Sequence, residues 1–330
     1  MIGVRPSLGY RLLYGYVRWM YTAVYSRRFE VRGADRVPQT GPVILVTTHQ
    51  NNLADACSVL FAAPRFPVFV ARADYFRQPL AARAMRFLRV LPMYRADHGR
   101  RAIETGLPVT MRQLADHLRA GGACVIMAEG SSVPTRTVRR LKKSWARLYL
   151  DALPDAPGLS VVPVAIEYSD WRQWGPDVRV TFGEPLTFAP APPGEAPRQL
   201  GAMNDHLHAA LADLVEGDDA IAAWHQTVTD RRRGNDAVWR MAGLPALALV
   251  WALFWPVLLL TRWAVRRHPR EDFRSTLEIA LVALGVPVWA LGLGIGVWGA
   301  FGPVAAGAGT LVLPLVLWAA ARGHIAWTRR

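Results

Sequence analysis

The chain has 330 residues, of which 52% are hydrophobic and 19% charged, and this composition excludes a disordered or fibrous protein. The formal net charge is +14, and only two of the basic residues, Lys142 and Lys143, are lysines. Such a balance suits nucleic acid, anionic lipid or a phosphorylated substrate. The two cysteines, Cys57 and Cys124, lack metal-ligand spacing and predict reduced thiols in a cytoplasmic core.

The first segment, residues 1–28, interleaves tyrosines and a tryptophan with arginines. The arginines interrupt any apolar run of the length that a secretory signal requires. Amphipathic rings and arginines sit well at the headgroup boundary of a bilayer, so we predict an interfacial amphipathic helix. Binding of single-stranded nucleic acid is the alternative for such a composition.

Residues 29–198 alternate short apolar runs with helical patterns, which is typical of an α/β domain. Strands are expected at 29–33, 43–46, 67–71, 124–127, 161–166 and 178–182, and helices at 80–88 and 103–118. The proline-rich residues 190–197 predict a linker, and 199–234 a helical extension that is amphipathic to residue 230.

The tail, residues 235–330, contains three nearly uncharged runs, at 241–261, 279–301 and 302–321. About 20 apolar residues suffice to cross a bilayer, so each run is a candidate membrane segment. Arginine clusters flank the runs at 231–240, 262–274 and 322–330. The positive-inside bias favours the cytoplasmic side for all three clusters. We therefore expect 279–301 and 302–321 to form a hairpin, 241–261 to be re-entrant, and the catalytic domain to lie on the cytoplasmic face.

His49 follows directly on the strand at 43–46, where a rigid strand ends and a loop opens. This is a good place for a catalytic base, and Asp55 could orient its imidazole and stabilise the charged ring. A strand-end histidine that merely caps the next helix is the alternative. On an ideal helix this spacing does not put both side chains on one face, so part of the segment is expected to be a turn.

Three further segments lie at comparable places: Pro92-Met93-Tyr94-Arg95, Glu129-Gly130-Ser131-Ser132 and Val162-Pro163-Val164-Ala165. Together with the His49 segment, in this order and spacing, they resemble the four blocks of the glycerolipid acyltransferase family. The resemblance covers roughly residues 29–190. It departs from the family at two points, because five residues rather than four separate His49 from Asp55, and Met127-Ala128 replace Phe-Pro before Glu129.

The resemblance implies a mixed β-sheet flanked by helices, followed by C-terminal helical membrane segments. It implies a membrane-bound O-acyltransferase of phospholipid synthesis, with acyl-CoA or acyl carrier protein as donor. The acceptor would be glycerol-3-phosphate, dihydroxyacetone phosphate or lysophosphatidate. His49 would be the general base and Asp55 its orienting partner. The expected substrate-binding residues are Asn52, Arg95, Glu129, Gly130, Ser131 and Lys142.

Arg72 and Lys143 are weaker candidates for a phosphate contact, and Pro163 is expected to shape its strand. No group of His, Cys and carboxylate residues has ligand spacing, so we expect no metal and no cofactor beyond the acyl donor. A catalytically silent lipid-binding scaffold of the same fold is the alternative function. A nucleic-acid-binding membrane protein would explain the charge but would leave the ordered blocks without a role, so we expect no nucleic-acid partner.

Overall fold

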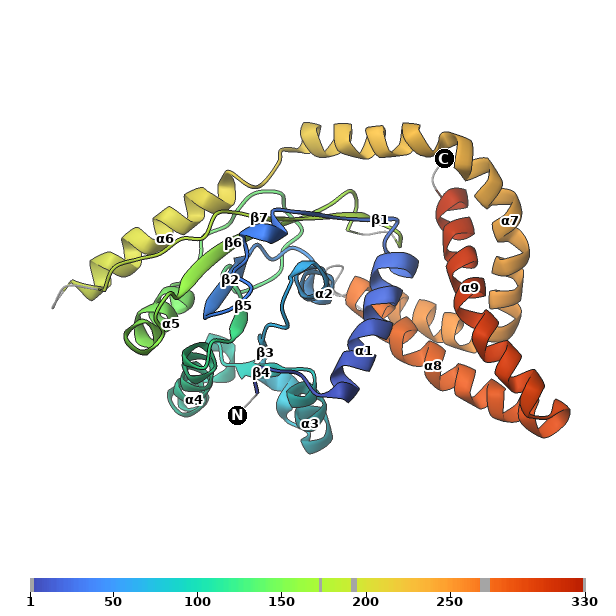
Figure 1. Ribbon diagram of the computed structural model, residues 1–330, viewed down its shortest axis with the longest axis horizontal. Helices are drawn as coiled ribbons and strands as arrows, with labels where there is room; N and C mark the ends of the chain where they lie inside the picture. The colour runs from blue at the N-terminus through green and yellow to red at the C-terminus, as the bar shows by residue number, and fades with distance from the viewer. Residues whose placement is uncertain (1–2, 172–173, 191–194, 268–273, 329–330) are drawn as a thin grey trace.

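The computed structural model describes residues 3–171, 174–190, 195–267 and 274–328. An α/β domain holds the N-terminal two thirds of the chain, and three long helices pack together at one side of it (Figure 1). The strands are β1 Arg28–Arg32, β2 Val43–Thr47, β3 Phe69–Arg72, β4 Val90–Met93, β5 Ala123–Met127, β6 Ser160–Tyr168 and β7 Asp177–Phe182. The α-helices are α1 Leu8–Trp19, α2 Asn52–Ala62, α3 Pro79–Phe87, α4 Arg100–Arg119, α5 Ser144–Ala152, α6 Ala196–Ala212, α7 Asp218–Arg267, α8 Arg274–Phe301 and α9 Pro303–Thr328.

The main sheet is mixed, with the order β1-β7-β6-β2-β5. β2 runs parallel to both β5 and β6, whereas β7 runs antiparallel to β6. β3 and β4 form a parallel pair that continues the sheet beyond β5, through a bridge between Val68 and Cys124. The α/β class with a mixed sheet is therefore what the structure shows.

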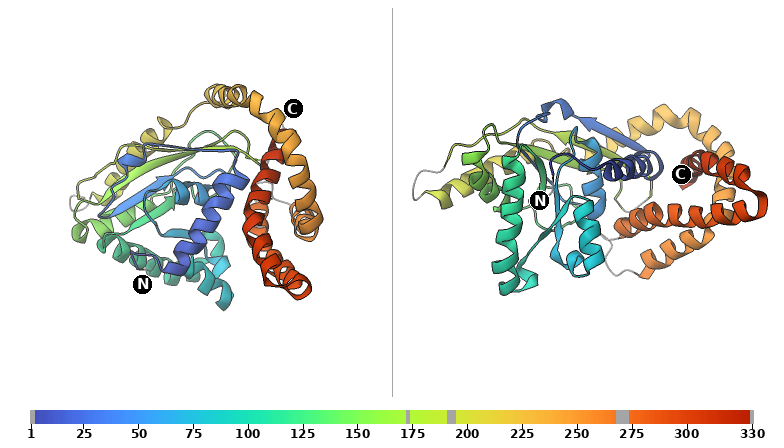
Figure 2. Two further views of the ribbon diagram at one scale, coloured as in Figure 1. Left: turned by 45° about the vertical axis from the view of Figure 1, so that its right-hand side comes forward. Right: turned by 60° about the horizontal axis from the view of Figure 1, so that its bottom comes forward.

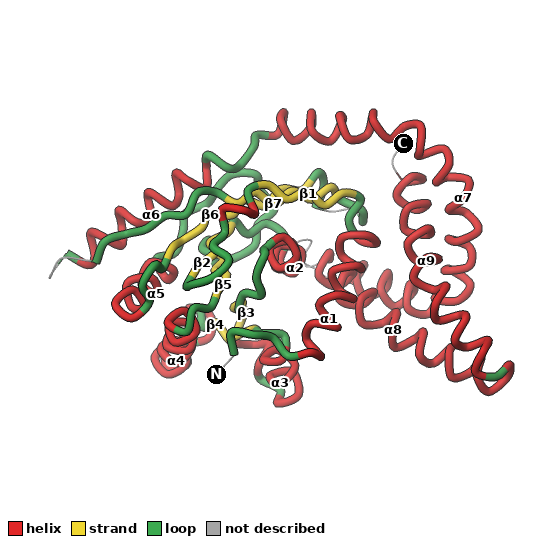
Figure 3. Tube along the Cα trace, viewed as in Figure 1, coloured by secondary structure: helices red, strands yellow, loops and turns green. Residues whose placement is uncertain are grey.

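The central strand β2 is buried on both faces, as its uninterrupted apolar sequence requires. Val43 and Leu45 contribute to one core cluster, whereas Ile44 and Val46 contribute to the other. The first cluster lies under α2 and includes the segment after α1. The second lies under α4, α5 and α6. The sheet is thus enclosed between two layers of helices (Figure 3).

The N-terminal segment forms α1 and then a π-helical turn, Met20–Tyr25. Its tyrosines are largely part of the core: Tyr21 and Tyr25 stack on each other with ring centroids 5.2 Å apart, and Tyr10 is also buried. Leu8 and Leu12 of α1 are exposed instead. The segment thus presents its exposed leucines, not its tyrosine rings, to the surroundings, and its predicted interfacial role stays a prediction.

The tail consists of α7, α8 and α9, which lie beside the α/β domain in every view (Figures 1 and 2). Three segments are long and apolar enough to cross a membrane: Gly243–Arg267, Arg274–Phe301 and Ala306–Ile325. α8 and α9 form a helical hairpin that turns at Gly302, whose φ of +83° is the left-handed conformation that glycine tolerates best.

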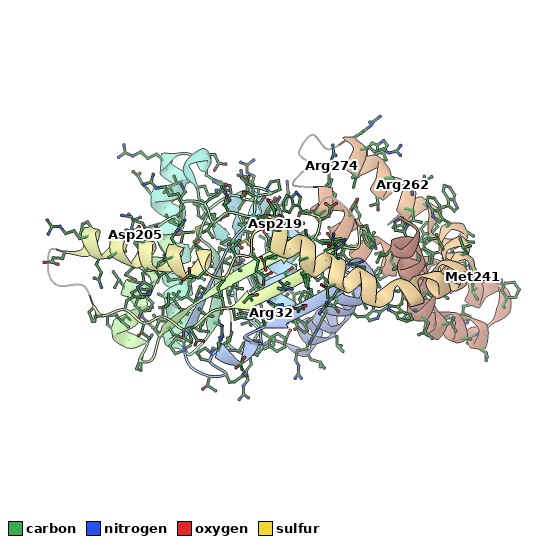
Figure 4. The ribbon with its side chains drawn as sticks, turned by 90° about the horizontal axis from the view of Figure 1, so that it is seen from above. Arg32, Asp205, Asp219, Met241, Arg262 and Arg274 are labelled. Carbon is green, nitrogen blue, oxygen red and sulfur yellow. The ribbon has the colours of Figure 1, made fainter. Side chains whose placement is uncertain are left out.

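Helix α7 is continuous over 50 residues and contains Pro245 and Pro256. Seen from above, it runs from Asp219 beside the sheet to Met241 at the far end of the molecule, while α6, which carries Asp205, lies at the opposite end (Figure 4). The domain boundary expected at residue 234 therefore falls inside one helix. The amphipathic stretch expected over 199–230 is divided between α6 and α7, and half of the proline-rich segment, residues 191–194, lies outside the described residues.

Candidate active site

The candidate residues follow strands that all end at one edge of the sheet. β2 ends at Thr47 and pairs in parallel with β5, which ends at Met127. β3 runs in the same direction beside β5, and β4 is parallel to β3. The carboxyl ends of parallel strands meet at one edge, where open α/β sheets bind ligands. His49, Glu129 and Arg95 follow the ends of β2, β5 and β4, respectively, and so share this edge.

His49 and Asp55 form a hydrogen-bonded pair. Nδ1 of His49 lies 2.8 Å from Oδ2 of Asp55. The same oxygen accepts the backbone N–H groups of Gln50 and Asn51, each at 2.7 Å, so the loop is folded around the carboxylate. The residues between the pair form a turn that passes into α2, which begins at Asn52. Because a carboxylate only accepts, Nδ1 carries the hydrogen and Nε2 has its lone pair available.

The second carboxylate oxygen of Asp55 is bound by a residue of the sheet. The Tyr168 hydroxyl, at the end of β6, donates to Oδ1 of Asp55 at 2.8 Å. Burial raises the pKa of Tyr168 well above its ordinary value, so the hydroxyl keeps its hydrogen and remains a donor. Ser58 links this hydroxyl to that of Tyr21, at 3.2 and 2.7 Å. Asp55 is fully buried, whereas the His49 ring is 14% exposed, as a base that meets substrate requires.

Both carboxylate oxygens of Glu129 accept hydrogen bonds from N–H groups of the protein. Its Oε2 accepts the backbone N–H of His49 at 3.1 Å and a guanidinium hydrogen of Arg139 at 2.7 Å. Its Oε1 accepts the backbone N–H of Arg139 at 2.9 Å. Arg139 also donates to the carbonyl of His49 at 3.3 Å and to the Ser131 hydroxyl at 3.1 Å. Glu129 and Arg139 therefore hold the His49 backbone between them.

Gly130, Ser131 and Lys142 lie next to this ion pair. Gly130 has a φ of +77°, and a Cβ on it would lie 3.2 Å from Cγ of Lys142. The backbone N–H of Lys142 donates to the carbonyl of Ala128 at 2.7 Å. The Lys142 side chain thus runs along the Gly130 turn and is exposed. Lys143 instead approaches α6, with its Nζ 3.8 Å from the place of a Cβ on Gly201.

Arg95 lies in a short turn that follows β4. Its backbone N–H donates to Nδ1 of His98 at 3.1 Å, and its carbonyl accepts the His98 N–H at 2.9 Å. Arg72, the last residue of β3, pairs with Asp74 at 2.6 Å and Asp97 at 2.8 Å. The hydrogen bond that Arg72 donates to Asp74 is the largest cause that raises the pKa of Arg72. Arg72 therefore ties this turn to β3, and Arg95, within the turn, is a candidate contact for a substrate phosphate.

Asn52 is the first residue of α2 and has a φ of +38°. A positive φ is uncommon outside glycine, and asparagine is among the residues that tolerate it best. Asn52 lies between His49 and Asp55. Strained backbone conformations of this kind cluster at active sites.

Two other histidines precede an aspartate with the family's four-residue gap. His208 of α6 contacts the Val138 carbonyl at 3.2 Å. His225 of α7 pairs with Asp177 at 2.9 Å. Among the described residues, no group of three His, Cys, Asp or Glu side chains is arranged to hold a metal ion.

Arg139 and Tyr168 are the site residues that sequence reasoning misses. Arg139 belongs to a basic stretch in a chain with many arginines, so its charge carries no signal. Tyr168 ends an apolar strand, where an aromatic residue ordinarily indicates core packing. The signal available for Arg139 is its place shortly after Glu129, since a buried carboxylate needs a partner.

Comparisons with known proteins point to the acyltransferases. The acyltransferase family model matches residues 28–167. A 1-acyl-sn-glycerol-3-phosphate acyltransferase of Pseudomonas aeruginosa is 22% identical over 226 residues, which cover 64% of this chain and 81% of that protein. The crystal structure of the 1-acyl-sn-glycerophosphate (LPA) acyltransferase PlsC from Thermotoga maritima aligns with a TM-score of 0.46 and 18% identity, over 62% of this chain and 79% of that one. Residues 28–167 are therefore an acyltransferase domain, and the chain is an acyltransferase enzyme whose similarity is to the glycerolipid acyltransferases.

Proposed function

We propose that the protein is a membrane-bound O-acyltransferase of phospholipid synthesis that uses His49 as its general base. It moves a fatty acyl group from acyl-CoA or acyl carrier protein to a hydroxyl of a glycerol phosphate acceptor. The observation that carries the proposal is the His49–Asp55 pair, 2.8 Å apart, at the carboxyl edge of the sheet. The fully buried Asp55 leaves only the ring of the pair in contact with solvent.

The reaction follows from the tautomer of His49. Nε2 takes the proton of the acceptor hydroxyl while that oxygen attacks the thioester carbonyl carbon. The C–S bond then breaks, and the thiolate leaves and recovers the proton from His49. Asp55 stabilises the imidazolium in between. General base catalysis of this kind contributes roughly 10²–10⁴-fold.

The acceptor is expected to present a phosphate to this edge. Arg95 and Lys142 are its proposed contacts, because a guanidinium fork and an exposed ammonium both suit a phosphomonoester. The carboxylate of Glu129 is already engaged by Arg139 and His49. We therefore propose that Glu129 positions the loop, and that Gly130 and Ser131 line the acceptor site. The Pseudomonas relative's name makes 1-acyl-sn-glycerol-3-phosphate the first acceptor to test.

The bilayer is the proposed location of the enzyme. Within the described residues, three helical segments have the length and apolarity to cross it, and many of their large apolar side chains are exposed, including Leu284, Leu291 and Leu315. The arginine clusters that flank these segments support a catalytic domain on the cytoplasmic face.

The experiment is an acyl-transfer assay in membranes that carry the wild-type protein, His49→Ala or His208→Ala. Labelled acyl-CoA and labelled acyl carrier protein are each offered with the three acceptors. We expect product with one acceptor, loss of at least 10²-fold in His49→Ala, and wild-type activity in His208→Ala, which makes the same substitution at a histidine that also precedes an aspartate with the family's gap.

Full activity of a well-folded His49→Ala variant would refute the assignment of the base. Absence of product from the wild-type protein with every donor and acceptor would refute the proposed reaction and favour the silent scaffold.

A further inference from the structure

The first turn of the tail helix α8 lies on the loop that carries His49. The Ser275 hydroxyl donates to Oδ1 of Asn51. The backbone N–H of Leu53 donates to the Thr276 hydroxyl at 3.3 Å. Two consecutive residues of α8 thus bind the turn between His49 and Asp55, although 223 residues separate Leu53 from Thr276.

These contacts supply what the start of α2 lacks. The first N–H groups of a helix have no partner within the helix, and a side chain just before the helix ordinarily accepts from one of them. Asn51 stands in that place but makes no such bond within α2. Its side-chain oxygen accepts from Ser275 instead, and Thr276 accepts from Leu53. The N-terminus of α2 is therefore capped by a different helix.

The capped turn is the one that orients the catalytic pair. Asn51 holds Ser275 through its side chain and donates its backbone N–H to Oδ2 of Asp55 at 2.7 Å. That oxygen is the one that binds Nδ1 of His49. From Ser275 to the imidazole, the connection therefore passes through two residues only, Asn51 and Asp55.

The first turns of α8 are also packed against the domain, so the hydroxyls of Ser275 and Thr276 are fixed in place. Ser275 is 6% exposed, and Ile279, one turn on, is part of the core cluster under α2. Further along, the Tyr16 hydroxyl of α1 donates to the Ala283 carbonyl at 3.0 Å. The tail helix thus joins the domain at the catalytic loop and at the N-terminal helix.

We propose that Ser275 and Thr276 are positioning residues for acyl transfer: they hold the turn that sets the orientation of His49, so that the membrane tail completes the active site. The inference rests on the proposed role of His49. It gives α8 a function beyond membrane attachment, because a ring displaced by about 1 Å can lose roughly 10²-fold in rate.

The test compares Thr276→Val, which removes the hydroxyl at nearly constant volume, with Thr276→Ser, which keeps it. Thr261→Val is the matched control, since Thr261 is a buried threonine of α7 that bonds to the Val257 carbonyl in its own helix. The full-length proteins are measured in phospholipid nanodiscs, with the acceptor and donor on which the wild-type protein acts. Hydrogen exchange of residues 47–57 is followed without substrate.

We expect kcat of Thr276→Val to fall roughly 10- to 100-fold, with KM for both substrates within about twofold of wild type. Exchange in the 47–57 segment should accelerate about fivefold, as for the loss of one hydrogen bond. Thr276→Ser and Thr261→Val should match wild type in both measurements.

Wild-type kcat and exchange in Thr276→Val would overturn the inference, as would an equal loss in Thr261→Val. Failure of the proposed role of His49 gives a different result, because the His49→Ala variant would then be active. The exchange measurement uses no substrate and reports on the α8 contact in either case.

Discussion

Asp55→Asn is the substitution that tests the electrostatic part of the mechanism most directly. Asparagine keeps the size of the side chain, so its amide oxygen can still accept from Gln50, Asn51 and His49 while its NH₂ group turns to Tyr168. The geometry of the loop survives, and the negative charge beside the imidazolium is lost. We therefore expect a folded protein with a large defect in the chemical step.

The size of the defect follows from the 2.8 Å contact between Nδ1 and Oδ2. Two unit charges about 4 Å apart interact by about 4 kcal/mol at an effective dielectric constant of about 20. An energy of about 4 kcal/mol in the transition state corresponds to roughly 10³-fold in rate. Some of the site is open to water, which weakens the interaction, so we expect kcat to fall by between about 10² and 10³-fold.

Asp55→Ala is the contrasting variant. It strands three buried donors, the N–H groups of Gln50 and Asn51 and the Tyr168 hydroxyl. Each costs about 1–3 kcal/mol, against a total stability of about 5–15 kcal/mol for a typical domain. We expect this variant to be poorly folded, and its inactivity to be uninformative for catalysis.

The assay measures kcat and KM of wild type and Asp55→Asn in reconstituted vesicles, with thermal unfolding of both proteins as the control for folding. A kcat within twofold of wild type in a folded Asp55→Asn variant would refute the reasoning. So would a loss of activity that tracks only a lower melting temperature.

The remaining predictions concern phosphate binding, pH, helix packing and topology. Lys142→Ala should raise KM for a phosphate acceptor about tenfold, because one hydrogen bond to a charged group contributes about 1.5–3 kcal/mol and tenfold corresponds to the lower value. Lys143→Ala should leave KM unchanged, and equal effects of the two substitutions in kinetic assays would refute the distinction. Burial is the main cause that raises the pKa of Glu167 from 4.5 to about 7, so the folded protein retains a proton that the unfolded chain releases. The free energy of unfolding should therefore fall as pH rises from about 4.5 to 7, by up to about 3 kcal/mol, and denaturation of Glu167→Gln across this range should show a flatter dependence. A Cβ on Gly243 would lie 2.4 Å from a glycine Cα of α9, so Gly243→Val should separate α7 from α9 and lower the melting temperature of the tail, unlike a substitution at exposed Met241. A reporter fused after Arg274 should score as cytoplasmic, and an external score would refute the proposed orientation.

Much of the fold follows from the sequence because its central strands are buried on both faces. Of the seven described strands, β2, β3, β5 and β6 are short apolar runs and β1 and β7 alternate apolar with polar residues, and the uninterrupted run of β2 contributes to two core clusters. β4 has no such signal. β4 begins only two residues after the end of α3, and its apolar residues continue the pattern of that helix. The chain changes direction at Arg89, whose φ is +62°. Side-chain patterns do not reveal that change of direction.

The contacts of the candidate site also divide into those that the local sequence predicts and those that it does not. The pairing of His49 with Asp55 is local, so spacing and the strand before it are enough to predict it. The contacts of Arg139 with Glu129, and of Thr276 with Leu53, join segments through the fold. The tyrosines of the N-terminal segment illustrate a further limit: an aromatic and basic pattern suits both a bilayer surface and a domain core, and Tyr21 and Tyr25 are in the core.

The position of Thr276 late in the chain has a consequence for biosynthesis. A ribosome adds about 5–20 residues per second, so the 223 positions from Leu53 to Thr276 take on the order of tens of seconds to make. On the proposed role of Thr276, the nascent acyltransferase domain lacks its cap throughout this interval and transfers acyl groups roughly 10- to 100-fold more slowly. The enzyme reaches its full rate when the tail has been synthesised and packed against the loop, so acyl transfer is fastest where the lipid product can enter a bilayer.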